Sequence, residues 1–204
     1  MTSFPMSIRS HLLAAAAAAA ALAVAPATLI WGASSAAAQT PPATDPSAAS
    51  LAVVMEFLAN TAPDRVEAAA SRLVAPDATY VSLNFSNPEL KQIEPWAGTA
   101  KGPGAYSGTF MRVANYWKIE DFTVTDKFAS GEDVAVLGRF TYRSVALGKV
   151  FTSPFSIHSK VRDGKMVHFQ FMEDTYASAA SFRQSGSWTV KTTLDSPPFE
   201  VGAP

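Results

Sequence analysis

Residues 151–173 read FTSPFSIHSKVRDGKMVHFQFME and predict two antiparallel strands joined by a tight turn. Apolar and polar side chains alternate on either side of Asp163-Gly164, which is the pattern of strands that bury one face. An Asp-Gly pair favours the two-residue turn of a hairpin, because it tolerates positive φ angles. Phe151–Arg162 and Met166–Glu173 are therefore expected to be neighbours in a sheet.

The alternation divides the side chains of these strands between two faces. Phe155, Ile157 and Val161 share one face of the first strand, whereas His158 points to the other. His168 has the same opposite parity in the second strand. If the apolar face lines the interior, both histidines face solvent or a second copy of the chain. A β-bulge would turn either of them inward.

Helical segments and further strands precede this hairpin. The spacing of apolar residues predicts one helix from Leu51 and a second that ends near Leu73. A strand and a long loop over residues 86–101 follow, and Pro103 suits the first turn of a third helix. Alternation from Ile119 onward predicts two more strands. Three N-terminal helices packed on a curved, mostly antiparallel sheet predict an α+β fold in the shape of a cone.

The two ends of the chain differ in composition from its middle. Residues 1–38 carry one charged side chain, a long alanine-rich apolar run and small residues before Gln39, which is typical of a cleaved secretory signal. Cleavage predicts an exported protein, periplasmic or secreted, that keeps no stable membrane anchor; an uncleaved anchor is the alternative. The expected parts are then a Pro-rich linker over 39–48, a folded domain over 49–185 and a C-terminal extension over 186–204.

The composition excludes several classes of function. The 204 residues have a net charge of -1 and no cluster of Lys and Arg, so no nucleic acid is expected as a partner. The sequence has no cysteine, which excludes disulfides, thiolate metal sites and a cysteine nucleophile. The histidines lack metal-binding spacing, and Gly102-Pro103-Gly104 lacks the lysine of a phosphate-binding loop. We therefore expect neither a metal nor a cofactor.

Four short motifs occur in the order typical of one protein family. They are Asp77-Ala78-Thr79, Gly102-Pro103, Arg162–Val167 and Glu173-Asp174-Thr175. Together with the order of helices and strands, they resemble the SnoaL-like family of the nuclear transport factor 2-like superfamily. The resemblance implies a cone-shaped α+β fold with a deep pocket, and frequent homodimers through the open face of the sheet.

The resemblance also implies where the catalytic residues of this superfamily would stand. Ser82 occupies the position of the ketosteroid isomerase base, and a serine hydroxyl cannot act as that base near neutral pH. Phe140, Tyr142 and Phe171 stand where limonene-epoxide hydrolases have arginine and aspartate. The last-strand acid of SnoaL-type cyclases also falls near Phe171, closely followed by Glu173. An identifiable inherited catalytic set is therefore missing.

Candidate site residues can still be named. Glu173, Asp174 and His158 are the candidates for acid–base catalysis, because an aromatic pocket raises the pKa of a carboxyl group and histidine titrates near neutral pH. Asp174 alternatively caps the following helix, and His158 alternatively lies outside the pocket. The candidates for ligand binding are aromatic and amide side chains expected to line the cone: Tyr80, Asn84, Trp96, Tyr106, Phe110, Tyr142 and Phe171.

Two functions fit these features. The first is an exported domain that binds a small hydrophobic molecule in an aromatic-lined cavity, without an identifiable catalytic set. The alternative is an enzyme similar to polyketide cyclases or isomerases, with Glu173 or a pocket histidine as its acid–base group. In both cases the expected partners are the small molecule and a second copy of the chain in a homodimer.

Overall fold

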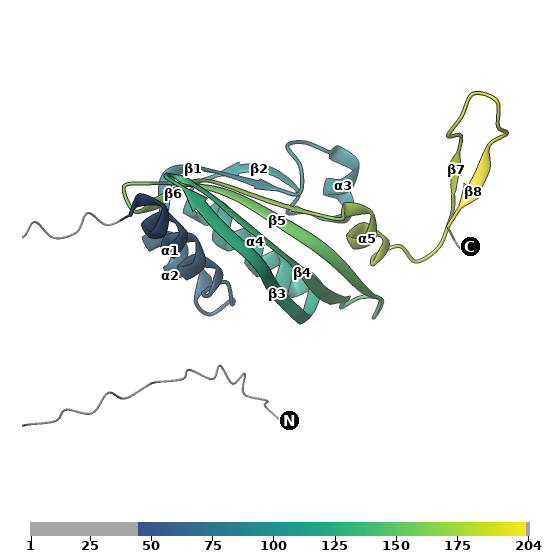
Figure 1. The fold of residues 1–204 in the computed structure, drawn as a ribbon. Coiled ribbons are helices and arrows are strands. Elements are labelled where there is room, and N and C mark those ends of the chain that lie inside the picture. The colour runs from purple at the N-terminus through teal and green to yellow at the C-terminus, as the bar shows by residue number, and fades with distance from the viewer. Residues whose placement is uncertain (1–44, 203–204) are drawn as a thin grey trace, which may run out of the picture. The chain divides into compact units, whose positions relative to one another are not determined.

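The computed structural model of the protein describes residues 45–202 (Figure 1). The predicted signal segment 1–38 and residues 39–44 of the predicted linker lie outside the described residues. The helices are, in chain order, α1 (Pro46–Leu58), α2 (Val66–Leu73), α3 (Pro88–Ile93), α4 (Pro103–Tyr116) and α5 (Thr175–Ala180). The strands are β1 (Val74–Ser82), β2 (Gly98–Lys101), β3 (Trp117–Ser130), β4 (Asp133–Ser144), β5 (Val150–Arg162), β6 (Lys165–Glu173), β7 (Trp188–Val190) and β8 (Phe199–Val201).

One six-stranded sheet organises the fold, with the order β2-β1-β6-β5-β4-β3. Every neighbouring pair is antiparallel except β1 with β6. The expected hairpin joins β5 to β6, and its two turn residues Asp163 and Gly164 have φ angles of 50° and 72°. The predicted α+β class with a mostly antiparallel sheet is therefore confirmed.

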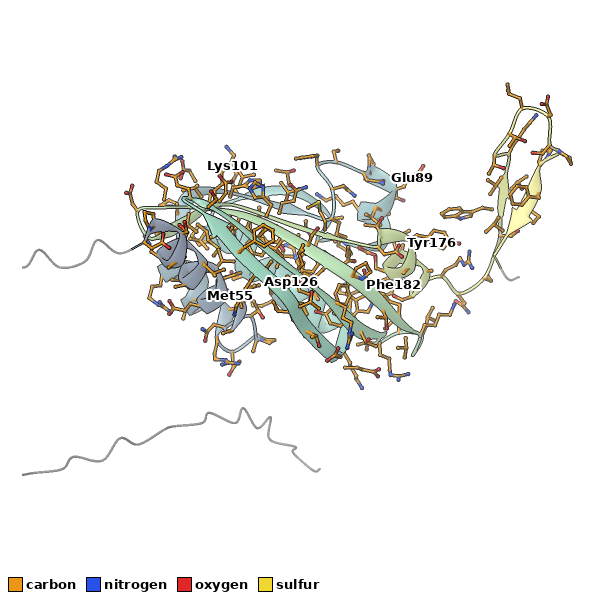
Figure 2. All side chains as sticks on the ribbon, in the orientation of Figure 1. Met55, Glu89, Lys101, Asp126, Tyr176 and Phe182 are labelled. Atoms are coloured by element: carbon orange, nitrogen blue, oxygen red, sulfur yellow. The ribbon has the colours of Figure 1, made fainter. Side chains whose placement is uncertain are left out.

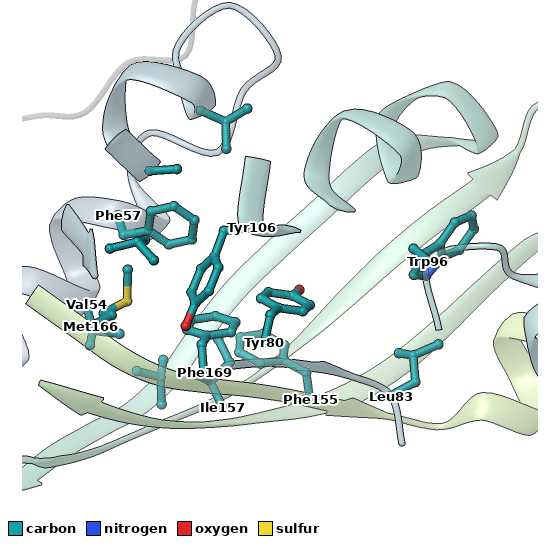
Figure 3. Packing of buried hydrophobic residues seen from close by; sticks show 14 of the residues in the cluster. Val54, Phe57, Tyr80, Leu83, Trp96, Tyr106, Phe155, Ile157, Met166 and Phe169 are labelled. Carbon is teal, nitrogen blue, oxygen red and sulfur yellow. The ribbon is translucent and has the colours of Figure 1, made fainter. Parts of the chain in front are cut away.

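The helices α1, α2 and α4 cover one face of this sheet, called here the inner face (Figure 1). Figure 3 shows how their aromatic side chains meet those of the strands. The ring of Phe57 in α1 packs edge-on against Tyr106 in α4 and Phe169 in β6, with ring centroids 5.9 Å apart in each pair. Tyr80 in β1 stacks on Phe169 at 5.4 Å. These contacts form a solid apolar core between helices and sheet.

The register of the last two strands decides which residues share the inner face. Phe155 in β5 lies opposite Glu173 in β6, and Ile157 lies opposite Phe171. Residues that lie directly opposite each other in a sheet point to the same side, so Glu173 belongs to the buried, inner side with Phe155. The intervening residue His158 lies opposite Gln170 on the outer face, as the alternation predicted.

The segment 86–101 differs from the long loop that was expected. It contains α3 and β2, and the Asn87 side chain caps α3 by accepting a hydrogen bond from the Leu90 N–H at 2.9 Å. Pro88 occupies the first turn, where a missing N–H costs little. The Asn87-Pro88 pair thus starts a helix here, and the prediction of a loop did not take this signal into account.

The chain ends also differ in detail from the expected parts. Asp45 caps α1 through the Ser47 N–H at 3.0 Å, so this helix begins inside the range 39–48 assigned to the linker. The C-terminal extension contains a small hairpin formed by β7 and β8. None of the helices within residues 45–202 is long and apolar enough to cross a bilayer.

Candidate functional site

Polar groups gather at one end of the inner face. Strands β1, β4 and β6 run in the same direction, because β6 is parallel to β1 and both β4 and β6 are antiparallel to β5. They end at Ser82, Ser144 and Glu173, toward the same end of the sheet. Gly138 of β4 lies level with Glu173, so β4 continues past that level to Ser144. The helices α3 and α5 lie at this end, which we call the wide end (Figure 1).

Glu173 is the last residue of β6 and presents its carboxyl group to the inner face. Its Oε1 atom is buried and has no hydrogen-bond partner among residues 45–202. Burial raises the pKa of Glu173 to about 8, and the nearby charge of Glu94 adds to the rise, while the Ser178 hydroxyl opposes part of it. Glu173 is therefore a carboxyl group that can hold a proton at neutral pH.

Glu94 is a second buried carboxyl group at the wide end. It follows α3 directly, its side chain is 0% exposed, and neither of its carboxyl oxygens has a hydrogen-bond partner in the described part of the chain. Its backbone is fixed on both sides: its N–H donates to the Leu90 carbonyl at 2.7 Å, and its carbonyl accepts from the Ala97 N–H at 2.9 Å. Burial raises the pKa of Glu94 to about 7.

Sequence reasoning missed Glu94, because it placed this residue in a polar loop. Two signals were available: the helix start at Asn87-Pro88, and a lone acid between the apolar residues Ile93 and Trp96. Neither signal shows that Glu94 lies near Glu173, since the two residues are far apart in the sequence. Only in the folded chain does the charge of Glu94 act on Glu173.

Ser178 in α5 lies close to both carboxyl groups, which we call the carboxyl pair (Glu94 and Glu173). Ser178 is 0% exposed, and its hydroxyl donates to the Thr175 carbonyl at 3.4 Å. Two neighbouring carboxyl groups in an apolar environment resist losing both protons. Burial is the main cause of the raised pKa of Glu94, and the charge of Glu94 adds to the effect of burial on the pKa of Glu173.

Several predicted ligand-binding residues surround the carboxyl pair. Tyr80 and Tyr142 are buried, and burial followed by neighbouring charges that include Glu173 raises the pKa of both phenols. The ring of Phe171 stacks on that of Phe155 at 5.5 Å. The Asn84 Oδ1 atom is buried and has no hydrogen-bond partner within the described range.

Trp96 also lies at the wide end, where it forms part of an aromatic wall. Its ring centroid lies 4.9 Å from that of Trp117 and 6.5 Å from that of Phe182. The indole N–H of Trp117 donates to the Ser181 hydroxyl at 3.0 Å, which ties the residue after α5 to this wall. Trp96 therefore shapes the site through packing.

Tyr106 and Phe110 belong to the core rather than to the wide end. The Tyr106 hydroxyl donates to the Thr79 carbonyl at 3.0 Å, so its polar group is already satisfied. Phe110 packs edge-on against Phe57, with ring centroids 5.6 Å apart. Both residues also contact the predicted ligand-binding residue Tyr80, whose ring centroid lies 4.9 Å from that of Tyr106 and 6.5 Å from that of Phe110.

Asp174 caps the N-terminus of α5 with its side chain. Its Oδ1 atom accepts hydrogen bonds from the Tyr176 N–H at 3.1 Å and the Ala177 N–H at 3.0 Å. A carboxylate that satisfies two backbone donors at a helix N-terminus stabilises the helix. Asp174 therefore has the role of a helix cap, the alternative that the sequence allowed for it.

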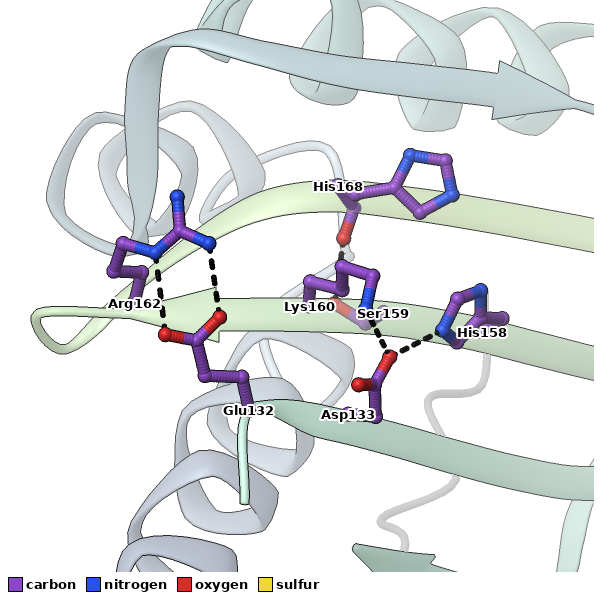
Figure 4. A network of polar contacts seen from close by, with 7 residues as sticks. All are labelled: Glu132, Asp133, His158, Ser159, Lys160, Arg162 and His168. Atoms are coloured by element: carbon purple, nitrogen blue, oxygen red, sulfur yellow. Dashed lines mark hydrogen bonds and ion pairs between the residues drawn. The ribbon is translucent and has the colours of Figure 1, made fainter. Parts of the chain in front are cut away.

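His158 lies on the outer face, away from the carboxyl pair (Figure 4). Its Nε2 atom lies 2.8 Å from Asp133 Oδ1, to which the Lys160 ammonium also donates at 2.6 Å. The His168 ring is 5.5 Å away on the same face. The interior site therefore contains no contribution from His158, because strand parity turns it outward. No group of three or more His, Asp or Glu residues that could hold a metal ion occurs within residues 45–202.

A groove of about 450 Å³ is lined by residues of α3, of α5 and of the segment that follows α5. Figure 2 shows Glu89 on α3 near Tyr176 and Phe182 at α5. The groove is lined mostly by apolar side chains of these helices and by Trp188 of the C-terminal hairpin: Leu90, Ile93, Tyr176, Ala179, Ala180, Phe182 and Trp188. The same two helices adjoin the carboxyl pair, since Glu94 follows α3 directly and α5 carries Ser178.

Two curated fungal proteins are similar to the chain in sequence. Patulin synthesis protein F of Aspergillus clavatus is 43% identical over 131 residues, which cover 63% of this chain and 66% of that protein. Patulin biosynthesis cluster protein F of Penicillium expansum is 40% identical over 134 residues, which cover 64% of this chain and 67% of that protein. The chain thus spans about two thirds of the length of the curated relatives it matches. It matches no protein-family model.

Solved structures share the fold at lower sequence identity. A nuclear transport factor 2-like protein from Burkholderia thailandensis has a TM-score of 0.55 and 22% identity, and the match covers 66% of this chain and 97% of that one. A structure described as a SnoaL-like polyketide cyclase from Jannaschia has a TM-score of 0.55 and 12% identity, and the match covers 70% and 97%. The chain therefore has the nuclear transport factor 2-like fold of the SnoaL-like proteins, as its motifs predicted, and belongs to the family of the patulin cluster F proteins.

Proposed function

We propose that the chain is an enzyme that uses Glu173 as an acid–base group on a small, hydrophobic, oxygen-bearing molecule. The observation that carries the proposal is the carboxyl group of Glu173, which lies on the aromatic inner face opposite Phe155. Its Oε1 atom is buried and has no hydrogen-bond partner among residues 45–202. A carboxyl group whose pKa lies near neutrality suits proton transfer in both directions. This favours the catalytic alternative over a domain that only binds a ligand.

The surroundings of Glu173 support a small and largely apolar substrate. Phe155 and Phe171 provide flat apolar surface beside the carboxyl group, while the amide of Asn84 offers a hydrogen bond to an oxygen atom. The reaction we propose is proton transfer to and from such a ligand, as in a polyketide cyclase-like enzyme.

The names of the relatives support a more specific substrate class. Both curated relatives are described as proteins of patulin synthesis. We therefore place the substrate among the small molecules of patulin synthesis.

Complementation of a Penicillium expansum strain that lacks its own cluster protein F tests this proposal. The chain is expected to restore patulin, measured by mass spectrometry, whereas Glu173→Gln at equal protein level should restore less than about a hundredth, in line with the loss of a general acid–base group. Glu67→Gln is the matched control, since Glu67 is exposed on α2. No restoration by the wild-type chain would overturn the link to patulin, and full restoration by Glu173→Gln would overturn the role of Glu173.

Export and dimer formation stay proposals of their own. Because the curated relatives are fungal, secretion is the form of export that we propose. N-terminal sequencing of the secreted chain should then begin at Gln39, and an intact Met1 in a membrane fraction would contradict it. Sedimentation of the purified chain should give twice the mass of one copy if the homodimer forms.

A further inference from the structure

The groove lined by α3, α5 and Trp188, called here the aromatic groove, plays no part in the proposed proton transfer. Its volume of about 450 Å³ lies within the range of about 300–1,000 Å³ that is typical of small-molecule sites. Trp188 and Tyr176 both line it, and their rings meet edge to face with centroids 5.3 Å apart. The groove therefore has the size and the aromatic walls of a site for a small molecule.

The two aromatic side chains leave much of their surface to water. Trp188 is 56% exposed and Tyr176 is 50% exposed, although apolar residues such as Phe182 lie in the same groove (Figure 2). Ile93 adds apolar surface from α3 and is itself exposed. Exposed apolar surface that is gathered in one place is typical of a binding site, and aromatic faces favour contact with another ring. The walls thus favour a flat, apolar ring as the occupant.

A cation lies at the end of the groove that Trp188 forms. Arg183 lines the groove, and its guanidinium packs against Gly202, where an added Cβ atom would lie 2.6 Å from Arg183 Nη1. Gly202 follows Val201, which pairs with Trp188 in the hairpin of β7 and β8. The guanidinium therefore lies beside the end of the hairpin that carries Trp188. No Asp or Glu of residues 45–202 forms an ion pair with Arg183.

The charges of the groove are separated between its two sides. Lys149 adds a second positive charge near Arg183, because its ammonium donates to the Arg183 carbonyl. Glu89 is the acid among the lining residues and belongs to α3. An anionic group on the ligand is therefore favoured at Arg183, on the side that follows α5. A guanidinium binds a carboxylate through two parallel charge-assisted hydrogen bonds, which fix both its position and its orientation.

We propose that the aromatic groove binds a small aromatic carboxylate, whose ring packs against Trp188 and Tyr176 and whose carboxylate pairs with Arg183. Such an occupant also supplies contacts that the hairpin needs, because two paired strands of three residues each are marginally stable alone. Binding should therefore hold the hairpin against α5. The site does not depend on proton transfer at Glu173.

Benzoate is the probe, and the test is a titration of the 15N-labelled full chain by NMR at pH 7. The indole N–H signal of Trp188, identified by its loss in Trp188→Phe, should shift saturably with benzoate. Benzyl alcohol has the ring without the charge and should bind at least about tenfold more weakly. Arg183→Gln should weaken benzoate binding by a similar factor. Arg112→Gln is the matched control and should bind as the wild type does, since Arg112 is exposed on α4 outside the groove.

Trp188→Ala tests the aromatic wall, with Phe199→Ala as the control, because Phe199 is an exposed ring of the same hairpin that does not line the groove. Only Trp188→Ala should weaken the binding of benzoate, measured by saturation-transfer NMR of the ligand. Equal binding of benzoate and benzyl alcohol to the wild type would overturn the proposal, even if a variant fails to fold. So would unchanged affinity in folded Arg183→Gln. A Trp188 signal that shifts on dilution of the chain but not with benzoate would assign the groove to a second copy and overturn the proposal as well.

Discussion

Gly138 in β4 shows how one residue shapes the aromatic surface beside Glu173. A Cβ atom at this position would lie 2.2 Å from the Thr123 carbonyl oxygen and 2.5 Å from the Phe155 ring. The missing side chain lets Phe155 lie against the strand and stack on Phe122 at 4.6 Å and on Phe171 at 5.5 Å. The aromatic surface beside Glu173 therefore depends on a glycine in the neighbouring strand.

Gly138→Ala should lower the free energy of unfolding by about 1–3 kcal/mol, because the methyl group meets both backbone and ring and the site is overpacked. Gly108→Ala is the control: within the described residues nothing lies within 4 Å of a Cβ added there. In the middle of α4 this change should raise stability by about 0.5–1 kcal/mol. Urea denaturation followed by tryptophan fluorescence measures both. Equal stability of Gly138→Ala and the wild type would contradict the close contact.

At the scale of elements, the short helix α5 depends on contacts at both ends. Asp174 caps its start, and the Asp174 N–H donates to the Ser153 hydroxyl of β5 at 2.8 Å. After its end, the Ser181 hydroxyl accepts from Trp117 and donates to the Ser178 carbonyl at 2.6 Å. A helix of six residues is not stable by itself, so these contacts hold Ser178 beside the carboxyl pair.

Asp174→Ala should cost about 0.5–2 kcal/mol of stability through the lost cap, whereas Asp174→Asn should cost much less, because asparagine caps helices equally well. Thermal unfolding of the two variants gives the comparison. Turnover provides the second readout: Asp174→Asn is expected to stay active. If Asp174→Asn is inactive but as stable as the wild type, Asp174 has a role in catalysis besides capping the helix.

At the scale of the whole molecule, the carboxyl pair links folding to pH. Both groups have folded-state pKa values above their ordinary value of 4.5, namely about 7 for Glu94 and about 8 for Glu173. Between pH 4.5 and about pH 8 the native state therefore binds more protons than the unfolded state, and the free energy of unfolding falls as pH rises through this range. Below pH 4.5 both states are protonated, and above pH 8 both are ionised, so the pair adds no further change there.

The free energy of unfolding should consequently decrease between pH 5 and pH 8, by at most about 1.4 kcal/mol per pH unit for each group. The double variant Glu94→Gln/Glu173→Gln should lose this slope and be more stable than the wild type at pH 8. Denaturation curves at several pH values test it. A wild-type stability that rises from pH 5 to pH 8 would show that the pair is not buried as described.

Much of the architecture could be predicted from the sequence, because its signals are local. Alternation predicted the strands around Asp163-Gly164 and the outward position of His158, and both are confirmed. The Asp174 cap was foreseen as an alternative and is observed. Glu94 was missed, because its neighbours in sequence say nothing of the distant strand end that it approaches.

The sequence by itself determined the class of fold and the two faces of the sheet, since both depend on the period of apolar residues along each strand. Only the tertiary structure decided which acids meet. Glu94 and Glu173 come from separate elements. Their pKa values rise because the packed chain removes water from both, and the charge of Glu94 adds to the rise at Glu173. Burial and proximity are properties of the folded chain, so no short stretch of residues carries them.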